Sequence, residues 1–89
     1  PDLEAGIDAA REALTNAVKH SDAQRISLFS EVVDGTASIH VRDDGQGIIG
    51  ADLDRLSIRL NQRVESVGGL VAVDSGGRDG TEVKITVRT

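Results

Sequence analysis

The dipeptide Asp34-Gly35 constrains the fold of this chain more tightly than any other feature. Asp-Gly between two apolar segments is a strong signal for a two-residue β-hairpin turn. Before it, residues 25–33 alternate apolar and polar side chains, and residues 36–42 continue as a second strand. We therefore predict that these two segments pair as antiparallel strands.

Two amphipathic helices flank the hairpin in the sequence. Residues 2–20 and 52–67 each place apolar side chains at helical spacing, which predicts one buried stripe per helix. Gly68-Gly69 then ends the second helix, where a residue of positive φ is common. The stripes consist of Leu3, Ile7, Ala10, Leu14 and Ala17 or Val18 in the first helix, and of Leu53, Leu56, Leu60, Val64 and Val67 in the second.

The C-terminal part is predicted to form two more strands, at residues 70–74 and 81–88, joined by the turn-rich segment 75–80. The order is then α-β-β-α-β-β. Two amphipathic helices on one face of a mixed, mostly antiparallel sheet would bury both apolar surfaces. The predicted fold class is therefore α+β, a two-layer α/β sandwich that makes residues 1–89 one domain.

The composition argues against several classes of function. The chain has no Cys, which excludes disulfides and thiolate metal sites. Its net charge of −5 argues against a nucleic-acid partner, because phosphate backbones are bound by excess Lys and Arg. No apolar run approaches the roughly 18–20 residues that span a bilayer, so we expect a cytoplasmic chain without membrane contact. An acidic protein can still bind a nucleotide where a local site and Mg²⁺ neutralise the phosphates.

One face of the first helix carries a group of polar residues. At about 100° per residue, Glu12, Asn16 and Lys19 fall within about 60° of one another, and His20 lies at the edge of the same arc. Such a face is usually just solvated. The alternative is an acid, an amide and a base directed at one bound group. Asn is slightly unfavourable inside a helix, which makes Asn16 notable without deciding between the two.

A glycine-rich stretch, Asp43-Asp44-Gly45-Gln46-Gly47, directly follows the second strand. One Asp-Gly pair would be enough for a turn. The second glycine raises the alternative that backbone lies close to a ligand. From these residues alone, both interpretations stay open.

Four segments in this order resemble the ATP-binding catalytic domain of sensor histidine kinases, in the branch related to bacterial nitrate and oxygen sensors. This domain belongs to the GHKL superfamily and has the Bergerat-type ATP-binding fold. Each motif is weak alone, but four matches in this order make the resemblance strong, and it extends over nearly the whole chain. The segments are REALTNAVKH (11–20), DDGQGI (43–48), RVESVGG (63–69) and GGRDGTEVKITV (76–87).

The resemblance implies ATP and Mg²⁺ as ligands, and a role for each matching residue of the first helix. Asn16 matches the amide that ligates Mg²⁺ between the ATP phosphates. Glu12 matches the acid beside that metal, which orients or polarises the attacking group. Lys19 and His20 match basic positions that reach phosphate oxygens. His20 is not the expected phosphoacceptor, because that histidine lies on a separate dimerisation helix in the family.

The other matching residues belong to the adenine end of the implied site. Asp43 matches the acid that accepts a hydrogen bond from the adenine amine. Gly45 and Gly47 match glycines that let backbone lie against the base. Thr81 matches a hydroxyl that supports the adenine, directly or through water, although a threonine at this position could equally be a simple strand residue.

The implied activity is transfer of the γ-phosphoryl group of ATP to a histidine on another domain. The implied partners are the dimerisation and histidine-phosphotransfer domain of the same protein and, indirectly, a response regulator. The family also has an edge strand before its first helix. We therefore expect this chain to be a fragment of a larger sensor kinase, and to be inactive alone.

The chain departs from the family where a flexible lid is expected. Only residues 48–52 separate Gly47 from the second helix, and Arg59 stands where a lid glycine is expected. Losing backbone N–H donors should weaken phosphate binding, with partial compensation by the charge of Arg55 or Arg59. Three alternatives stay open: a degenerate GHKL module that acts through protein contacts, a serine kinase of the anti-sigma-factor type, and a small α+β domain whose glycines only form turns.

Overall fold

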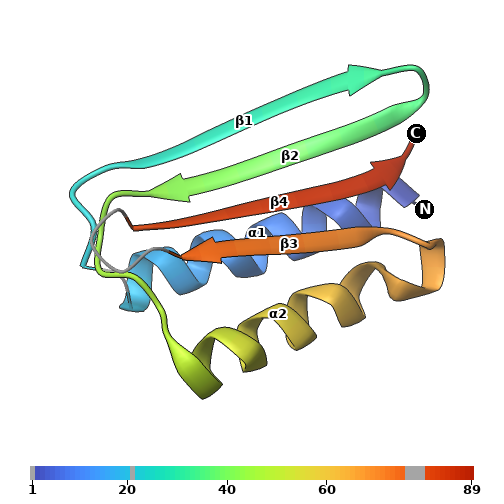
Figure 1. The fold of residues 1–89 in the computed structure, drawn as a ribbon. Helices are drawn as coiled ribbons and strands as arrows, with labels where there is room; N and C mark the ends of the chain where they lie inside the picture. Colours follow the sequence, from blue (N-terminus) through green and yellow to red (C-terminus); the bar gives the residue numbers. More distant parts are fainter. Residues whose placement is uncertain (1, 21, 76–79) are drawn as a thin grey trace.

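The computed structural model describes residues 2–20, 22–75 and 80–89. Two helices lie on one side of a four-stranded sheet (Figure 1). The predicted α+β sandwich and the order α-β-β-α-β-β are confirmed. The elements are α1 (Asp2–His20), β1 (Ile26–Val33), β2 (Thr36–Asp43), α2 (Gly50–Val64), the 3₁₀ turn η1 (Glu65–Val67), β3 (Leu70–Ser75) and β4 (Thr81–Arg88).

The sheet has the strand order β1-β2-β4-β3, and each neighbouring pair is antiparallel. The expected mixed, mostly antiparallel sheet therefore contains no parallel pair among the described strands. Because α2 carries the chain from β2 to the far edge, β4 returns between β2 and β3 (Figure 1). This topology brings the end of β2 directly beside the start of β4.

The predicted hairpin turn and the predicted end of the second helix have the expected backbone conformations. Residues 76–79 of the predicted turn at 75–80 lie outside the described residues. Asp34 and Gly35 have φ values of 51° and 77°, as a two-residue hairpin turn requires. Gly68 has φ 70°, and the N–H of Gly69 donates to the carbonyl of Val64 at 2.9 Å. The second helix begins two residues earlier than predicted, and its last residues form η1 instead of α-helix.

The buried face of α1 agrees only in part with the predicted apolar stripe, since Ala10 and Ala17 are buried and Leu14 is half-buried against the core. Leu3, Ile7 and Val18 are 44%, 42% and 66% exposed. Small residues form the buried face because α1 packs very close to the sheet. A Cβ placed on Gly6 would lie 3.0 Å from a methyl group of Val87. The buried residues of α1 are Gly6, Ala9, Ala10, Ala13 and Ala17.

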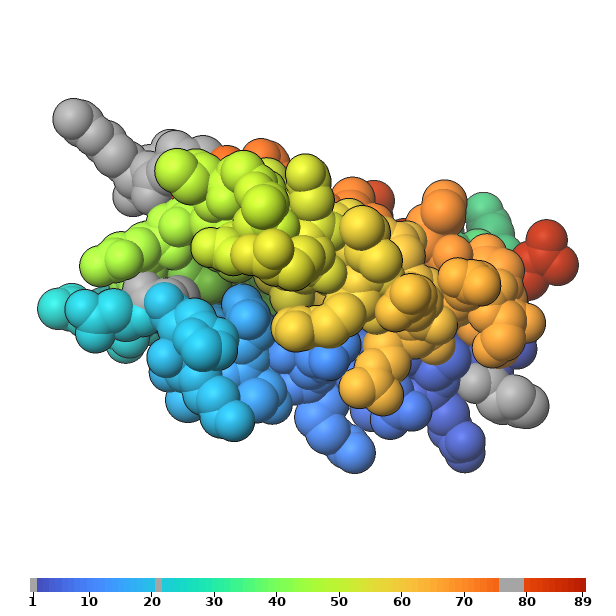
Figure 2. Space-filling view, turned by 90° about the horizontal axis from the view of Figure 1, so that it is seen from below, coloured from blue at the N-terminus to red at the C-terminus, as the bar shows by residue number. Residues whose placement is uncertain are grey.

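The stripe of α2 is confirmed, since Leu56, Leu60 and Val64 are buried. They pack against the inward side chains of the sheet, which include Val83 and Ile85. Seen from below, α1 and α2 lie side by side and cover this face of the sheet (Figure 2). None of the helices in the described residues combines the length and the apolar character needed to cross a membrane.

Candidate functional site

Three polar residues form a row at one end of the sheet, on the side that faces the helices. Asp43 ends β2, and its register partner Thr81 begins β4. Ser75, which ends β3, is the partner of Thr81 on the other side. Asp43 and Thr81 are each only 5% exposed, and the hydroxyl oxygens of Ser75 and Thr81 lie 3.0 Å apart. A carboxylate is thus held in an almost buried polar row.

Gly80 explains how Thr81 comes so close to Asp43. It has φ 78°, and a Cβ at this position would lie 2.0 Å from the carbonyl oxygen of Asp43. No other residue type fits between these backbone segments without moving them. The need for glycine at position 80 has no signal in the local sequence, because it depends on the pairing of strands that are distant in the chain.

The loop that follows Asp43 is tied back to this row at two points. The N–H of Gly45 donates to Oδ1 of Asp43 at 3.0 Å, and the N–H of Ile48 donates to the hydroxyl of Ser75 at 2.6 Å. Gly45 and Gly47 do not belong to the glycines with positive φ in the described residues. Turn geometry therefore does not account for glycine at these two half-buried positions.

Asp44 is exposed, but it also has a structural role. Its Oδ1 accepts hydrogen bonds from the backbone N–H groups of Gln24 and Arg25, both at 2.9 Å. The N–H of Arg25, with that of Gln24, lowers the pKa of the Asp44 carboxyl below its usual range. Asp44 thereby joins the segment before β1 to the end of β2.

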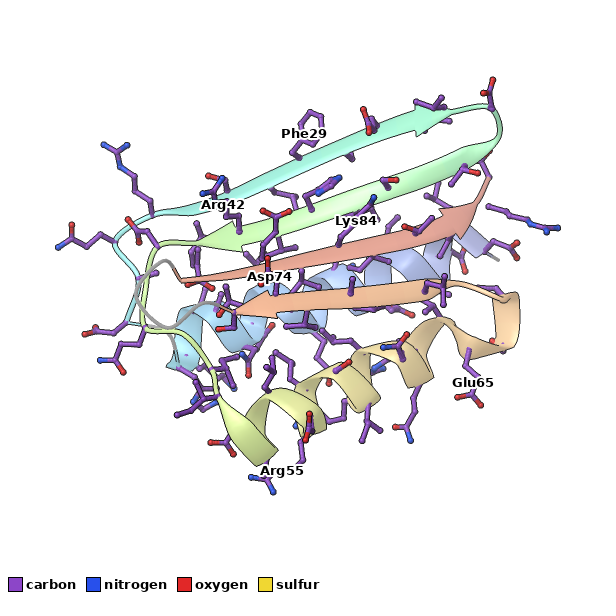
Figure 3. All side chains as sticks on the ribbon, in the orientation of Figure 1. Phe29, Arg42, Arg55, Glu65, Asp74 and Lys84 are labelled. Atoms are coloured by element: carbon purple, nitrogen blue, oxygen red, sulfur yellow. The ribbon has the colours of Figure 1, made fainter. Side chains whose placement is uncertain are left out.

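A polar groove of about 350 Å³ opens between the two helices. Asn16 and His20 of α1 line one side of it, and Gly47 of the loop lines its end. Arg55 and Arg59 contribute from α2, and Figure 3 shows Arg55 near the start of that helix. Since Ile48 also lines the groove, the loop connects the groove with the row at the sheet end.

The remaining two candidates on α1 lie apart from this groove. Lys19 is exposed and is not among the groove-lining residues. Glu12 is half-buried, one turn before Asn16, and its carboxylate contacts two arginines of α2. The structure therefore brings Asn16, His20 and Gly47 into one groove. Asp43 and Thr81 lie in the adjoining polar row, and Gly45 is hydrogen-bonded to that row.

Two residues that support the site were missed by the sequence analysis. Ser75 bonds to both the loop and Thr81. Asn61 joins α2 to β3, because its amide donates to the carbonyl of Val71 and accepts from the N–H of Val71, each at 3.0 Å. Neither residue belongs to a recognisable motif, so tertiary pairing alone reveals them.

The opposite face of the sheet carries none of the candidate residues. Figure 3 shows Phe29, Arg42 and Lys84 on this face. The His40 ring lies 5.5 Å from the Phe29 ring, and its Nδ1 lies 3.7 Å from the carboxylate of Glu82. His40 therefore contacts neighbours on the sheet and does not belong to the candidate site.

Comparison with known proteins identifies the family to which the chain belongs. Residues 7–89 match the family described as histidine kinase-, DNA gyrase B-, and HSP90-like ATPase. The nitrate/nitrite sensor protein NarQ of Escherichia coli is 32% identical over 87 residues, which cover 93% of this chain and 15% of NarQ. The chain belongs to this ATPase family. Within it, the chain is an ATP-binding catalytic domain of the sensor histidine kinase type.

Solved structures of this class have the same fold. The histidine kinase domain of the Erythrobacter litoralis EL346 blue-light activated kinase superposes with a TM-score of 0.72 at 33% identity, covering 90% of this chain and 41% of that one. The mycobacterial sensor histidine kinase MprB gives 0.68 at 26% identity, covering 90% and 67%. The chain thus spans about 15% of the length of a full sensor such as NarQ.

Proposed function

We propose that this domain binds Mg²⁺-ATP with the adenine at the sheet end and the phosphates in the groove between α1 and α2. Within a longer sensor protein, it would transfer the γ-phosphoryl group to a histidine of a dimerisation domain, which in turn serves a response regulator. The observation that carries this proposal is the buried Asp43, held beside Thr81 where the loop leads into the polar groove.

At the sheet end, the chemistry fits recognition of an adenine amine. A carboxylate is an acceptor only, and Asp43 is fixed by the N–H of Gly45 and by its place in the sheet. Gly45 and Gly47 present backbone without side chains, so a planar base can lie close to them. The hydroxyl of Thr81 completes the row and supports the base.

In the groove, the donor set fits a magnesium-bound polyphosphate. Asn16 offers an amide oxygen, and Mg²⁺ prefers a few oxygen ligands from the protein together with phosphates and water. The bound ion would neutralise charge that develops on the transferring phosphoryl group. His20 would contact phosphate oxygens, and Lys19 would do so from the rim. Glu12 would orient the attacking group from one turn away.

The first test is calorimetric titration with Mg²⁺-ATP, combined with thermal unfolding. At 100 times the dissociation constant, binding should stabilise the fold by about 2.7 kcal/mol. Asp43→Asn should weaken ATP binding by roughly tenfold or more, because a hydrogen bond to a charged group is lost. Asp74→Asn removes the same charge from the opposite face and should bind ATP like the parent.

The metal is tested separately through Asn16. We expect Asn16→Ala to remove the dependence of ATP affinity on Mg²⁺, whereas Gln62→Ala, an exposed amide on α2, should retain it. If millimolar Mg²⁺-ATP leaves the unfolding temperature unchanged, the domain is instead a non-catalytic binding module. If Asp43→Asn binds ATP like the parent, the adenine position is wrong.

A further inference from the structure

The carboxylate of Glu12 is shared by two arginines of α2. Arg63 approaches it with two nitrogens, Nε to Oε2 and Nη2 to Oε1, each at 3.4 Å. Arg59 approaches with Nε alone, 3.7 Å from Oε1. A two-point contact between guanidinium and carboxylate has better geometry than a single long one. Arg63 is thus the main partner of Glu12, and Arg59 is the partner that can leave.

Only one of these two arginines also borders the groove. Arg59 lines it together with Asn16 and His20, whereas Arg63 lines a separate hollow beside Glu12. The side chains of Arg59 and Arg63 are both about half exposed, at 56% and 52%. The Glu12 side chain is 22% exposed, but a single contact of 3.7 Å to a guanidinium that is half exposed to water contributes little stability. Moving Arg59 from Glu12 to an anion in the groove would therefore cost little, and Glu12 would keep Arg63.

Arg55, the other arginine of the groove, is placed differently. Its Nη2 contacts Oδ1 of Asp52, three residues earlier on the same helix. Asp52 also lines the groove, so an anion that approaches Arg55 meets the carboxylate as well. The partner of Arg59, in contrast, lies outside the groove and has a second cation. Arg59 is therefore the better placed of the two to take up a phosphate.

We propose that Arg59 exchanges between two anions: the carboxylate of Glu12 in the free protein and the phosphates of ATP in the complex. This inference rests on the proposed function and adds a phosphate-binding residue to it. It also makes Glu12 a competitor of the phosphates for Arg59. When Arg59 leaves, Glu12 stays oriented by Arg63 alone, so phosphate binding and the position of Glu12 are linked.

The first experiment compares ATP with adenosine by calorimetry at one fixed salt concentration. Arg59→Ala should weaken ATP binding by roughly tenfold or more and leave adenosine binding unchanged. Arg63→Ala removes the other arginine of Glu12 without removing a groove residue, and it should change ATP affinity by less than about threefold. Arg59→Lys keeps the charge and should restore part of the loss.

The second experiment is a double-mutant cycle with ATP in EDTA, so that a metal role of Glu12 does not enter. Glu12→Gln releases Arg59 and should tighten ATP binding by about two- to fivefold. In the Arg59→Ala background, the same substitution should give no gain. An equal gain in both backgrounds would show that Glu12 merely repels phosphate, and it would overturn the exchange.

A third probe, inorganic tripolyphosphate, separates this inference from the proposed function. If Asp43→Asn leaves ATP binding intact but tripolyphosphate binding still depends on Arg59, the adenine position fails and the Arg59 inference holds. If the parent binds ATP and Arg59→Ala binds it equally well, the inference fails while the proposed function stands. If the parent binds neither ATP nor tripolyphosphate, both are wrong.

Discussion

Helix α1 borders two hollows of opposite character. On the side of α2 lies the polar groove of about 350 Å³, with Asn16, His20 and Arg59 along it. On the side of β1 lies a larger hollow of about 500 Å³, lined mainly by apolar side chains such as Leu14 and Leu28. The larger hollow shares no residue with the candidate site. Size alone would favour the apolar hollow, whereas the chemistry of the lining residues favours the polar groove as part of the candidate site.

The difference follows from how the helices cover the sheet. Helix α1 packs mainly against β4 and β2, and α2 packs against β3. Helix α1 makes only slight contact with β1, so Leu28 and Val32 remain 63% and 64% exposed. The space between the helices is instead lined mainly by polar and charged side chains, together with Ile48 and Leu56. Small residues on α1 make this arrangement possible.

The largest expected effect comes from making the same substitution in the core and at the apolar hollow. Leu60 of α2 is fully buried in the core, and Leu28 of β1 borders the apolar hollow. Leu60→Ala should lower the free energy of unfolding by about 2–5 kcal/mol, because it removes packed methyl groups and leaves a cavity. Leu28→Ala should cost less than about 0.5 kcal/mol. Urea unfolding measures both, and equal losses would contradict the assigned difference in burial.

A smaller effect is expected at Asn61, which joins α2 to β3. Asn61→Ala removes both hydrogen bonds to the backbone of Val71 and should cost about 1–3 kcal/mol. Because α2 forms one wall of the polar groove, ATP affinity should fall with it, while the apolar hollow is unaffected. Gln62→Ala is the control, since Gln62 is exposed on the next position of the helix. Equal stability of the two variants would contradict this role of Asn61.

These contrasts show which parts of the molecule can be predicted from patterns in the sequence. Local sequence was sufficient to predict the Asp34-Gly35 turn and the end of the second helix at Gly68, because the backbone conformation at these positions favours particular residue types. Motif order predicted that Asp43 and Thr81 lie near each other, and they are register partners on neighbouring strands. The stripe predicted on α1 was right at Ala10 and Ala17 but wrong at Leu3 and Ile7, because hydrophobic periodicity favours large side chains over the alanines that allow close packing.

Other features depend on contacts between residues distant in sequence. Gly80 is needed because its backbone lies against Asp43, and Ser75 matters because it meets both Thr81 and the loop. The arginines on Glu12 come from a helix about fifty positions later, so their pairing with α1 has no local signal. Such contacts are fixed by topology, which the residue pattern of a single segment does not contain.

The smallest expected effect concerns Asp44, at the end of the loop that joins the sheet to the polar groove. The N–H groups of Arg25 and Gln24 lower its pKa below the ordinary value of 3.8. A carboxyl whose pKa is lower in the folded chain contributes stability above its unfolded pKa, and this contribution disappears as the pH falls through the folded pKa. We therefore expect Asp44→Asn to be less stable than the parent at neutral pH.

That difference should shrink once the pH falls below about 4, because the parent then also loses the charge on Asp44. Urea unfolding from neutral pH to about pH 2.5 measures it. Gln46 is an exposed residue of the same loop that does not titrate. The stability of Gln46→Ala should therefore differ from that of the parent by a constant amount over the whole pH range. If the stability difference between Asp44→Asn and the parent also stays constant over this pH range, the contribution of Asp44 does not come from its charge, because only a charge effect changes with protonation.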